Sequence, residues 1–204
     1  MVTRVRPALL VVDVQNDFCP GGALAVTNGD KVIEPLNELI RLFDKDHRLI
    51  IFSRDWHPRE TKHFAEFGGK WPAHCIQHTL GAGLHPQLVT PAKAYIISKG
   101  YGKTDDGYSP FEGVYFRYSD WPLSLQVLLR NVTELYIGGL ATDYCIKAAC
   151  LDARKLGYNV YLLTDACRAV NLKPGDEALA LSDMANAGVK FITTDEVLRE
   201  FESS

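Results

Sequence analysis

The chain has 204 residues, of which 47% are hydrophobic and 23% charged, and its formal net charge at pH 7 is −3. This composition is typical of a globular protein whose core needs neither disulfides nor metals, and the length fits one large domain over residues 1–204. The small negative charge gives no reason to expect nucleic acid or an anionic membrane surface as a partner. No apolar run reaches the roughly 18 residues that a membrane-spanning helix needs.

The cysteines and the first apolar run bear on the cellular compartment in which the protein works. Five cysteines are an odd number, and they follow no framework spacing, which favours reduced thiols over disulfides. The apolar run over residues 8–12 reaches Asp13 too soon to be the hydrophobic region of a signal peptide. We therefore expect a cytoplasmic protein.

Apolar runs and helix-like segments alternate along the chain. The runs that predict buried strands are 8–12, 49–52, 94–98, 135–137, 160–163 and 189–192. The segments that predict helices are 31–45, 123–129, 144–156 and 177–187. Continuous apolar strands separated by helices predict a doubly wound α/β fold, with a six-stranded, mainly parallel sheet covered by helices on both faces in three layers.

One stretch does not follow this alternation. Residues 56–92 are rich in proline, glycine, tryptophan and histidine and read as a long loop. Long loops in compact domains are usually functional or disordered, and the aromatic and histidine content favours function here.

Polar residues follow four of the predicted strands. Asp13, Asp55 and Lys99 end the first three strands, and Cys145 follows the fourth. Each could alone be a turn cap or a solvated loop residue. In open α/β sheets, however, the ligand crevice lies outside the carboxyl ends of the strands, so the fold brings these four residues together.

Cys145 begins a helix-like run. The amides and dipole at a helix N-terminus lower the pKa of a cysteine, and the same amides can hold an oxyanion. The alternative is a buried structural cysteine. An acid, an amine and a thiol together suggest nucleophilic hydrolysis, in which Lys99 lowers the pKa of Cys145 and Asp13 passes the thiol proton to a leaving amine.

A second group of residues suggests a metal site. Asp55 and His57 are two residues apart, with further histidines at 63, 74 and 78. Carboxylate and imidazole ligands suit Zn²⁺ and other divalent first-row ions, although surface histidines would give the same spacing. Cys75 is disfavoured as a ligand, because adjacent residues tend to point in different directions.

Five sequence blocks carry a resemblance to a known family. In chain order they are DVQNDF at 13–18 with GGAL at 21–24, DWHP at 55–58, WPAHC at 71–75, KG at 99–100 with YS at 108–109 and Phe111, and GGLATDYC at 138–145. They resemble the nicotinamidase/pyrazinamidase family of the isochorismatase-like cysteine hydrolases over most of the chain. The first and last blocks are shared across that superfamily, whereas the DWHP and WPAHC pair is more specific to nicotinamidases.

The resemblance implies roles for the residues near the chemistry. The catalytic triad would be Asp13, Lys99 and Cys145. The Leu140–Ala141 peptide bond would be cis, with the amides of Ala141 and Cys145 directed at the oxyanion.

The resemblance also implies a metal site and a substrate pocket. Asp55, His57 and His74 would bind the metal, usually zinc, whereas the role of His63 is left open and His78 falls outside the ligand positions. The walls of the ring pocket would be Phe18, Trp71 and Tyr108.

The function implied by the resemblance is metal-dependent hydrolysis of nicotinamide to nicotinate and ammonia through a cysteine thioester, a step in NAD salvage. Two alternatives stay open: another superfamily amidase, such as an N-carbamoyl amide hydrolase, and a catalytically silent metal- or ligand-binding member. The sequence leaves open whether the chain forms a homo-oligomer.

Overall fold

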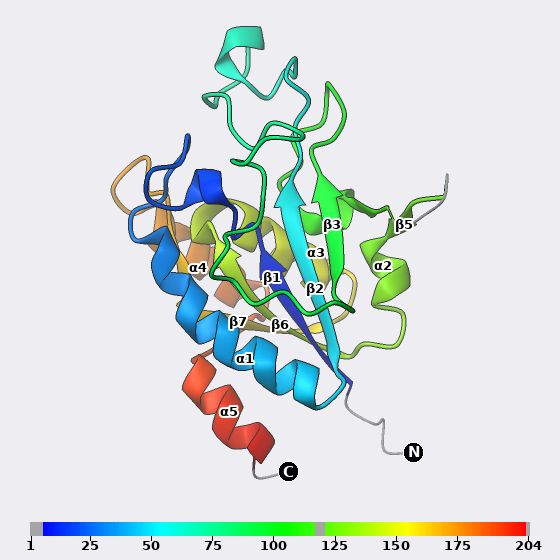
Figure 1. Ribbon diagram of the computed structural model, residues 1–204. Coiled ribbons are helices and arrows are strands. Elements are labelled where there is room, and N and C mark those ends of the chain that lie inside the picture. Colours follow the sequence, from blue (N-terminus) through cyan, green and yellow to red (C-terminus); the bar gives the residue numbers. More distant parts are fainter. Residues whose placement is uncertain (1–5, 117–120, 203–204) are drawn as a thin grey trace.

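The protein is described here by a computed structural model that covers residues 6–116 and 121–202, and its centre is one eight-stranded sheet (Figure 1). Its strands are β1 Pro7–Val12, β2 Leu49–Asp55, β3 Tyr95–Lys99, β4 Val114–Tyr115, β5 Leu123–Ser124, β6 Glu134–Leu140, β7 Asn159–Arg168 and β8 Lys190–Ile192. Their order across the sheet is β5-β4-β3-β2-β1-β6-β7-β8, and all neighbours from β3 to β8 pair in parallel. The predicted doubly wound α/β fold is confirmed.

The predicted number of six strands is wrong, because the sheet has two further strands. β4 and β5 have two residues each and pair antiparallel at the edge beside β3. Two residues are too few to show a hydrophobic period, so only the pairing in three dimensions defines these strands. The helix predicted over 123–129 is correspondingly shorter, because its first two residues form β5.

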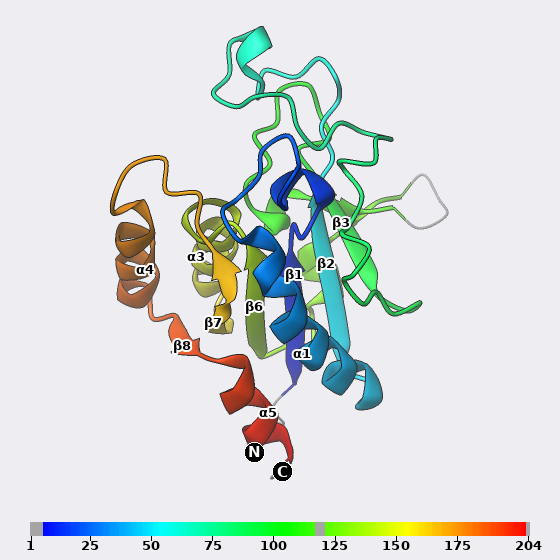
Figure 2. The ribbon, with the colours of Figure 1, turned by 60° about the vertical axis from the view of Figure 1, so that its left-hand side comes forward.

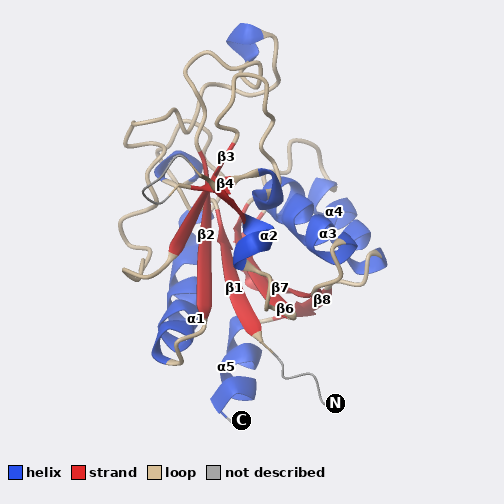
Figure 3. Ribbon diagram, turned by 90° about the vertical axis from the view of Figure 1, so that its right-hand side faces the viewer, coloured by secondary structure: helices blue, strands red, loops and turns tan. Residues whose placement is uncertain are grey.

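Helices cover both faces of the sheet (Figure 3). They are α1 Ile33–Lys45, α2 Leu125–Leu128, α3 Lys147–Lys155, α4 Asp176–Asn186 and α5 Thr194–Glu202. Short helical turns lie at Asn16–Phe18, Gly29–Val32, Ala65–Phe67 and Pro110–Glu112, and a π-helical turn lies at Thr142–Ile146. α5 lies beyond the helices predicted from the sequence. Within the described ranges, no helix combines the length and apolar character needed to cross a membrane.

The alternation of side chains along the central strand β1 divides the core into two layers. Leu9 and Val11 pack into the cluster that contains the apolar face of α1 and Val197 of α5. Leu10 and Val12 pack into the opposite cluster, with residues of α2, α3 and α4. All four β1 side chains have no exposed surface, which explains why this strand reads as a continuous apolar run.

The first part of the long segment over residues 56–92 lies beyond the carboxyl ends of the central strands, and its last part returns beside α1 to the start of β3 (Figures 1 and 2). It contains only one short helical turn among its described residues and is otherwise irregular, as predicted. Backbone hydrogen bonds fix it to the sheet: the Trp56 amide donates to the Lys99 carbonyl, and the His85 amide donates to the Val14 carbonyl. The first part of the segment therefore covers the edge of the sheet at which the polar residues gather.

Candidate active site

Lys99 is the centre of a buried polar cluster at the carboxyl end of β3. Its side chain has no exposed surface, and its Nζ lies 2.7 Å from Asp13 Oδ2 and 3.4 Å from Cys145 Sγ. The same ammonium forms an ion pair with Asp55 and donates to the Gly107 carbonyl at 2.7 Å. The structure thus brings together the carboxylate, amine and thiol that the sequence places after three different strands.

Parallel pairing accounts for this convergence. Asp55 and Lys99 are partners in the register of β2 and β3, so their side chains leave the same edge of the sheet. Asp13 follows β1, and its backbone amide donates to the Ser53 carbonyl at 3.2 Å. Ser53 Oγ in turn donates to Asp13 Oδ1 at 2.7 Å, which fixes the orientation of that carboxylate.

Burial sets the ionisation of Asp13 and Lys99. Burial raises the pKa of Asp13 to about 6, against the pull of the Lys99 ammonium in the opposite direction. Burial alone would lower the pKa of Lys99, but the neighbouring carboxylates of Asp13 and Asp55 raise it well above its usual value. Lys99 is therefore a permanent cation, whereas Asp13 can gain and lose a proton near neutral pH.

The environment of Cys145 differs from the one predicted. Cys145 lies inside the π-helical turn Thr142–Ile146, ahead of α3, and only 7% of its surface is exposed. Burial raises its pKa well above the usual value and outweighs the lowering effect of Lys99, while a hydrogen bond to Asp13 adds to the rise. The expectation of a lowered pKa for Cys145 is wrong for this resting site. Burial destabilises the thiolate by more than the attraction of the Lys99 ammonium stabilises it. Cys145 therefore rests as a thiol that can donate to Asp13.

The backbone before Cys145 is tightly constrained. The Leu140–Ala141 peptide bond is cis, as the resemblance implies. Gly139 has a φ of 127°, and a Cβ atom there would lie 2.0 Å from the Val12 carbonyl oxygen. Only glycine therefore allows β6 to approach β1 this closely at the site.

The predicted metal ligands form a second cluster beside Lys99. The free carboxylate oxygen of Asp55 lies 3.6 Å from His57 Nε2 and 3.7 Å from His74 Nε2. The opposite ring nitrogens are held by backbone carbonyls, since His57 Nδ1 lies 3.0 Å from Gly100 O and His74 Nδ1 lies 2.7 Å from Pro72 O. These contacts leave both Nε2 lone pairs facing Asp55, which is the usual arrangement of metal-binding histidines.

His63, whose role the sequence leaves open, lies in the same cluster. One ring nitrogen from each of His57, His63 and His74 lies within 4.8 Å of the others. The His63 ring is stacked on that of His57 with centroids 4.5 Å apart, and its Nδ1 lies 3.5 Å from Asp106 Oδ1. Burial, followed by the proximity of His57, lowers the pKa of His63 to about 4, so this imidazole is neutral as a metal ligand must be.

These donors fit a transition-metal ion. Three imidazoles and one carboxylate are the ligand types that Zn²⁺ and other divalent first-row ions prefer. His57 Nε2 is buried and has no hydrogen-bond partner among the described residues, which is costly unless a ligand satisfies it. The histidine that the sequence excludes, His78, packs its ring against Trp56 with centroids 5.2 Å apart.

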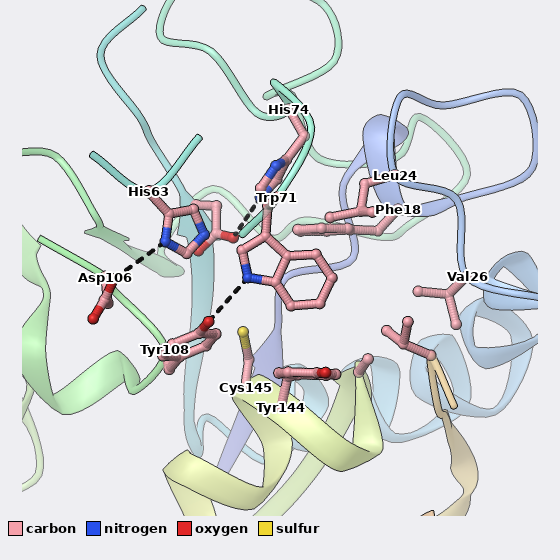
Figure 4. Close-up of a pocket in the computed structure, with 13 residues that line it drawn as sticks. Phe18, Leu24, Val26, His63, Trp71, His74, Asp106, Tyr108, Tyr144 and Cys145 are labelled. Carbon is pink, nitrogen blue, oxygen red and sulfur yellow. Dashed lines mark hydrogen bonds and ion pairs between the residues drawn. The ribbon is translucent and has the colours of Figure 1, made fainter. Parts of the chain in front are cut away.

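A pocket opens between the two clusters (Figure 4). It is lined by Phe18, Leu24, Val26, Asp55, His63, Trp71, His74, Asp106, Tyr108, Ala141, Tyr144, Cys145 and Val170. All three predicted aromatic residues are among these. Trp71 Nε1 donates to Tyr108 OH at 2.9 Å, and the Trp71 and Tyr144 rings pack in a T-shaped arrangement with centroids 4.8 Å apart.

Sequence reasoning missed several lining residues. They are Leu24, Val26, Asp106, Tyr144 and Val170. Tyr144 adjoins Cys145 and Leu24 ends the GGAL block, so the positions of these two in the motifs were the available signals. The others come from loops whose course cannot be derived from periodicity.

Comparison with known proteins gives a consistent relationship. The Isochorismatase domain model matches residues 7–196. The chain belongs to the isochorismatase family. The nicotinamidase of Escherichia coli (strain K12) is 42% identical over 203 residues, which cover 91% of this chain and 94% of that protein.

Two solved structures of relatives are complexes with small ligands. The pyrazinamidase of Pyrococcus horikoshii in complex with zinc is 44% identical, with a TM-score of 0.82 and coverage of 92% of this chain and 99% of that one. PnC1 of L. infantum in complex with nicotinate is 31% identical, with a TM-score of 0.79 and coverage of 94% of each chain. The resemblance drawn from the motifs is thus confirmed, and this family member is an amidohydrolase.

Proposed function

We propose that the chain is a metal-dependent nicotinamidase that hydrolyses nicotinamide to nicotinate and ammonia through a thioester on Cys145. The observation that carries this proposal is the pocket itself, which has Cys145 on one wall and the histidine cluster on another. The relatives named above as nicotinamidase and pyrazinamidase support the substrate class. The proposal includes a place in NAD salvage, in the cytoplasm, with zinc as the metal.

Substrate binding would use both the aromatic walls and the metal ligands. Phe18, Trp71 and Tyr108 provide apolar surface for a flat ring, and the hydrogen bond between Trp71 and Tyr108 fixes two of these walls relative to each other. A metal ion bound by Asp55 and the histidines would hold the pyridine nitrogen and so orient the carboxamide toward the sulfur.

The first half-reaction would form the thioester. Cys145 donates its proton to Asp13 as Sγ attacks the carboxamide carbon, and the developing oxyanion accepts hydrogen bonds from the amides of Ala141 and Cys145. Asp13 then protonates the amine, which leaves as ammonia. Lys99 stays charged throughout and stabilises the sulfur while it is anionic.

The second half-reaction would hydrolyse the thioester. A water molecule enters where ammonia has left, and Asp13, now ionised again, takes its proton. The water oxygen attacks the thioester carbon, and the Cys145 sulfur leaves and recovers the proton from Asp13. A carboxyl group with a pKa of about 6 suits both steps, because it can accept and return a proton near neutral pH.

A deamidation assay tests this proposal. The zinc-loaded protein should release ammonia and nicotinate in equal amounts from nicotinamide, and a strong chelator should abolish the release until zinc is restored. An N-carbamoyl amide tested in parallel should give little ammonia. A metal-loaded sample without activity on nicotinamide would overturn the proposal, and preference for the N-carbamoyl amide would indicate the other amidase class.

A further inference from the structure

We propose that Asp106 is a positioning residue that holds His63 as a ligand of the metal, an inference that rests on the metal site of the proposed function. The carboxylate of Asp106 lies 3.5 Å from His63 Nδ1, and both residues line the pocket (Figure 4). The sequence did not single out Asp106, and its role follows from a comparison of the three histidines.

Each of the three imidazoles has its Nδ1 held by a different partner. His57 is held by a backbone carbonyl at 3.0 Å and His74 by another at 2.7 Å. Among these three Nδ1 atoms, only that of His63 faces an acidic side chain. In metal sites the second ring N–H of a ligating histidine is donated to a carbonyl or carboxylate, which fixes the tautomer and the ring orientation. Asp106 therefore accepts from Nδ1 of His63, as backbone carbonyls do from Nδ1 of His57 and His74.

The loop that carries Asp106 is built into the site. The segment between β3 and the turn Pro110–Glu112 supplies the Gly100 carbonyl to His57 and the Gly107 carbonyl to Lys99. Gly107 has a φ of 68°, and a Cβ atom there would lie 2.4 Å from the Gly100 backbone nitrogen. The position next to Asp106 is thus constrained by close backbone packing, and in this arrangement the carboxylate lies beside His63.

Asp106 is exposed, so we expect its substitution to leave the fold intact, which makes its role testable. Its side chain is 75% exposed, whereas that of His63 is 5% exposed. Without the carboxylate, His63 loses the acceptor that keeps its proton on Nδ1. The proton can then move to Nε2, which removes the lone pair that this nitrogen would offer to a metal. We expect metal affinity to fall although all the ligands are still present.

The experiment measures the dissociation constant for Zn²⁺ by competition with a chelating dye, in the absence of substrate. Asp106→Ala should bind Zn²⁺ about 10- to 100-fold more weakly than the wild type, and Asp106→Asn should bind with an intermediate affinity because an amide oxygen can still accept. Asp105→Asn is the matched control, because Asp105 accepts from the Gly102 amide at 2.9 Å and lies outside the pocket lining. It should retain wild-type affinity. Unchanged affinity in Asp106→Ala, or an equal loss in Asp105→Asn, would overturn the proposal.

A double-mutant cycle with His63→Ala shows whether Asp106 acts through His63. If it does, Asp106→Ala should weaken Zn²⁺ binding in the wild-type background and have little further effect once His63 is gone. The absorption spectrum of the Co²⁺-loaded Asp106→Ala protein should shift in the same direction as that of His63→Ala. Full additivity in the cycle would refute a role through His63. These readouts need no turnover. A role of Asp106 in metal binding can therefore be confirmed even if nicotinamide is not hydrolysed, and it can be refuted even if nicotinamide is hydrolysed.

Discussion

Asp55 and Lys99 lie opposite each other in the register of β2 and β3, and their side chains form a buried ion pair. The second carboxylate oxygen of Asp55 faces His57 and His74 at 3.6 and 3.7 Å. One carboxylate therefore contacts both the ammonium beside Cys145 and the histidine cluster. The two halves of the site are joined by a single residue of the central sheet.

This arrangement predicts a large stability cost for removing Lys99. Lys99→Met would leave the buried carboxylates of Asp13 and Asp55 without their cation, which typically costs about 3–5 kcal/mol of unfolding free energy. The variant should also lose amidase activity. Urea unfolding of the metal-free proteins measures the first effect, and the nicotinamide assay measures the second.

The matched control is Lys103→Met. Lys103 Nζ lies 3.0 Å from Glu60 Oε2, but the two side chains are 70% and 66% exposed. Removing such a pair should change the unfolding free energy by no more than about 1 kcal/mol. Equal urea midpoints for Lys99→Met and Lys103→Met would contradict the buried-cation argument.

Asp13 predicts the pH dependence of the reaction. Burial raises the pKa of Asp13 to about 6, and the proposed mechanism needs the ionised form to accept the thiol proton. The value of kcat/KM should therefore fall as the pH drops through about 6. An aspartate with an ordinary pKa, near ~3.9, would hold the rate to much lower pH. A rate that stays level well below pH 6 would exclude Asp13 as the base.

Stability has the opposite dependence on this group. The folded-state pKa of Asp13 lies above the ordinary value of 3.8, so the native state binds the proton more tightly than the unfolded state. The stability contributed by Asp13 is therefore fully present below 3.8 and lost as the pH rises through about 6. A fall in activity near pH 6 thus cannot come from unfolding caused by Asp13, and a circular dichroism scan over the same range serves as the check.

Cys145→Ala should abolish turnover while nicotinamide still binds. Removal of a nucleophile typically lowers kcat by about 10⁴-fold or more, whereas the walls of the pocket are untouched. Nicotinate formation measures the first effect, and calorimetric titration with nicotinamide measures the second. Cys150→Ala is the control, because Cys150 is buried in α3 and lies outside the pocket lining. It should retain activity, and substantial turnover in Cys145→Ala would show that another group is the nucleophile.

The convergence of the site was predictable from the sequence because it follows from sheet geometry. Each of the strands before Asp13, Asp55 and Lys99 reads as an apolar run, and parallel strands end at one edge. The fold class thus predicts that these residues gather at one edge, whereas the order of the strands comes from the structure. The metal-ligand set was less accessible, because the segment over residues 56–92 has no period and only the resemblance separated His74 from His78.

What could not be predicted depends on burial and on loop geometry. The pKa of Cys145 is raised because the thiol is almost fully enclosed, and enclosure is a property of the folded chain rather than of a helix N-terminus. Asp106 faces His63 from a loop with close packing at Gly107, and the course of such a loop leaves no periodic pattern in the sequence. β4 and β5 exist through pairing between strands of two residues, which leave no pattern in the sequence.

His57→Ala tests the metal cluster directly. The substitution removes a buried ring nitrogen that faces Asp55 and has no hydrogen-bond partner among the described residues. Zinc content after purification should fall, and nicotinamide should bind at least about 10-fold more weakly when measured in the Cys145→Ala background, where turnover cannot interfere. His78→Ala is the matched control, because His78 packs on Trp56 and should leave both values unchanged. Full zinc occupancy in His57→Ala would remove His57 from the ligand set, and normal nicotinamide binding by a zinc-depleted sample would show that the metal does not orient the substrate.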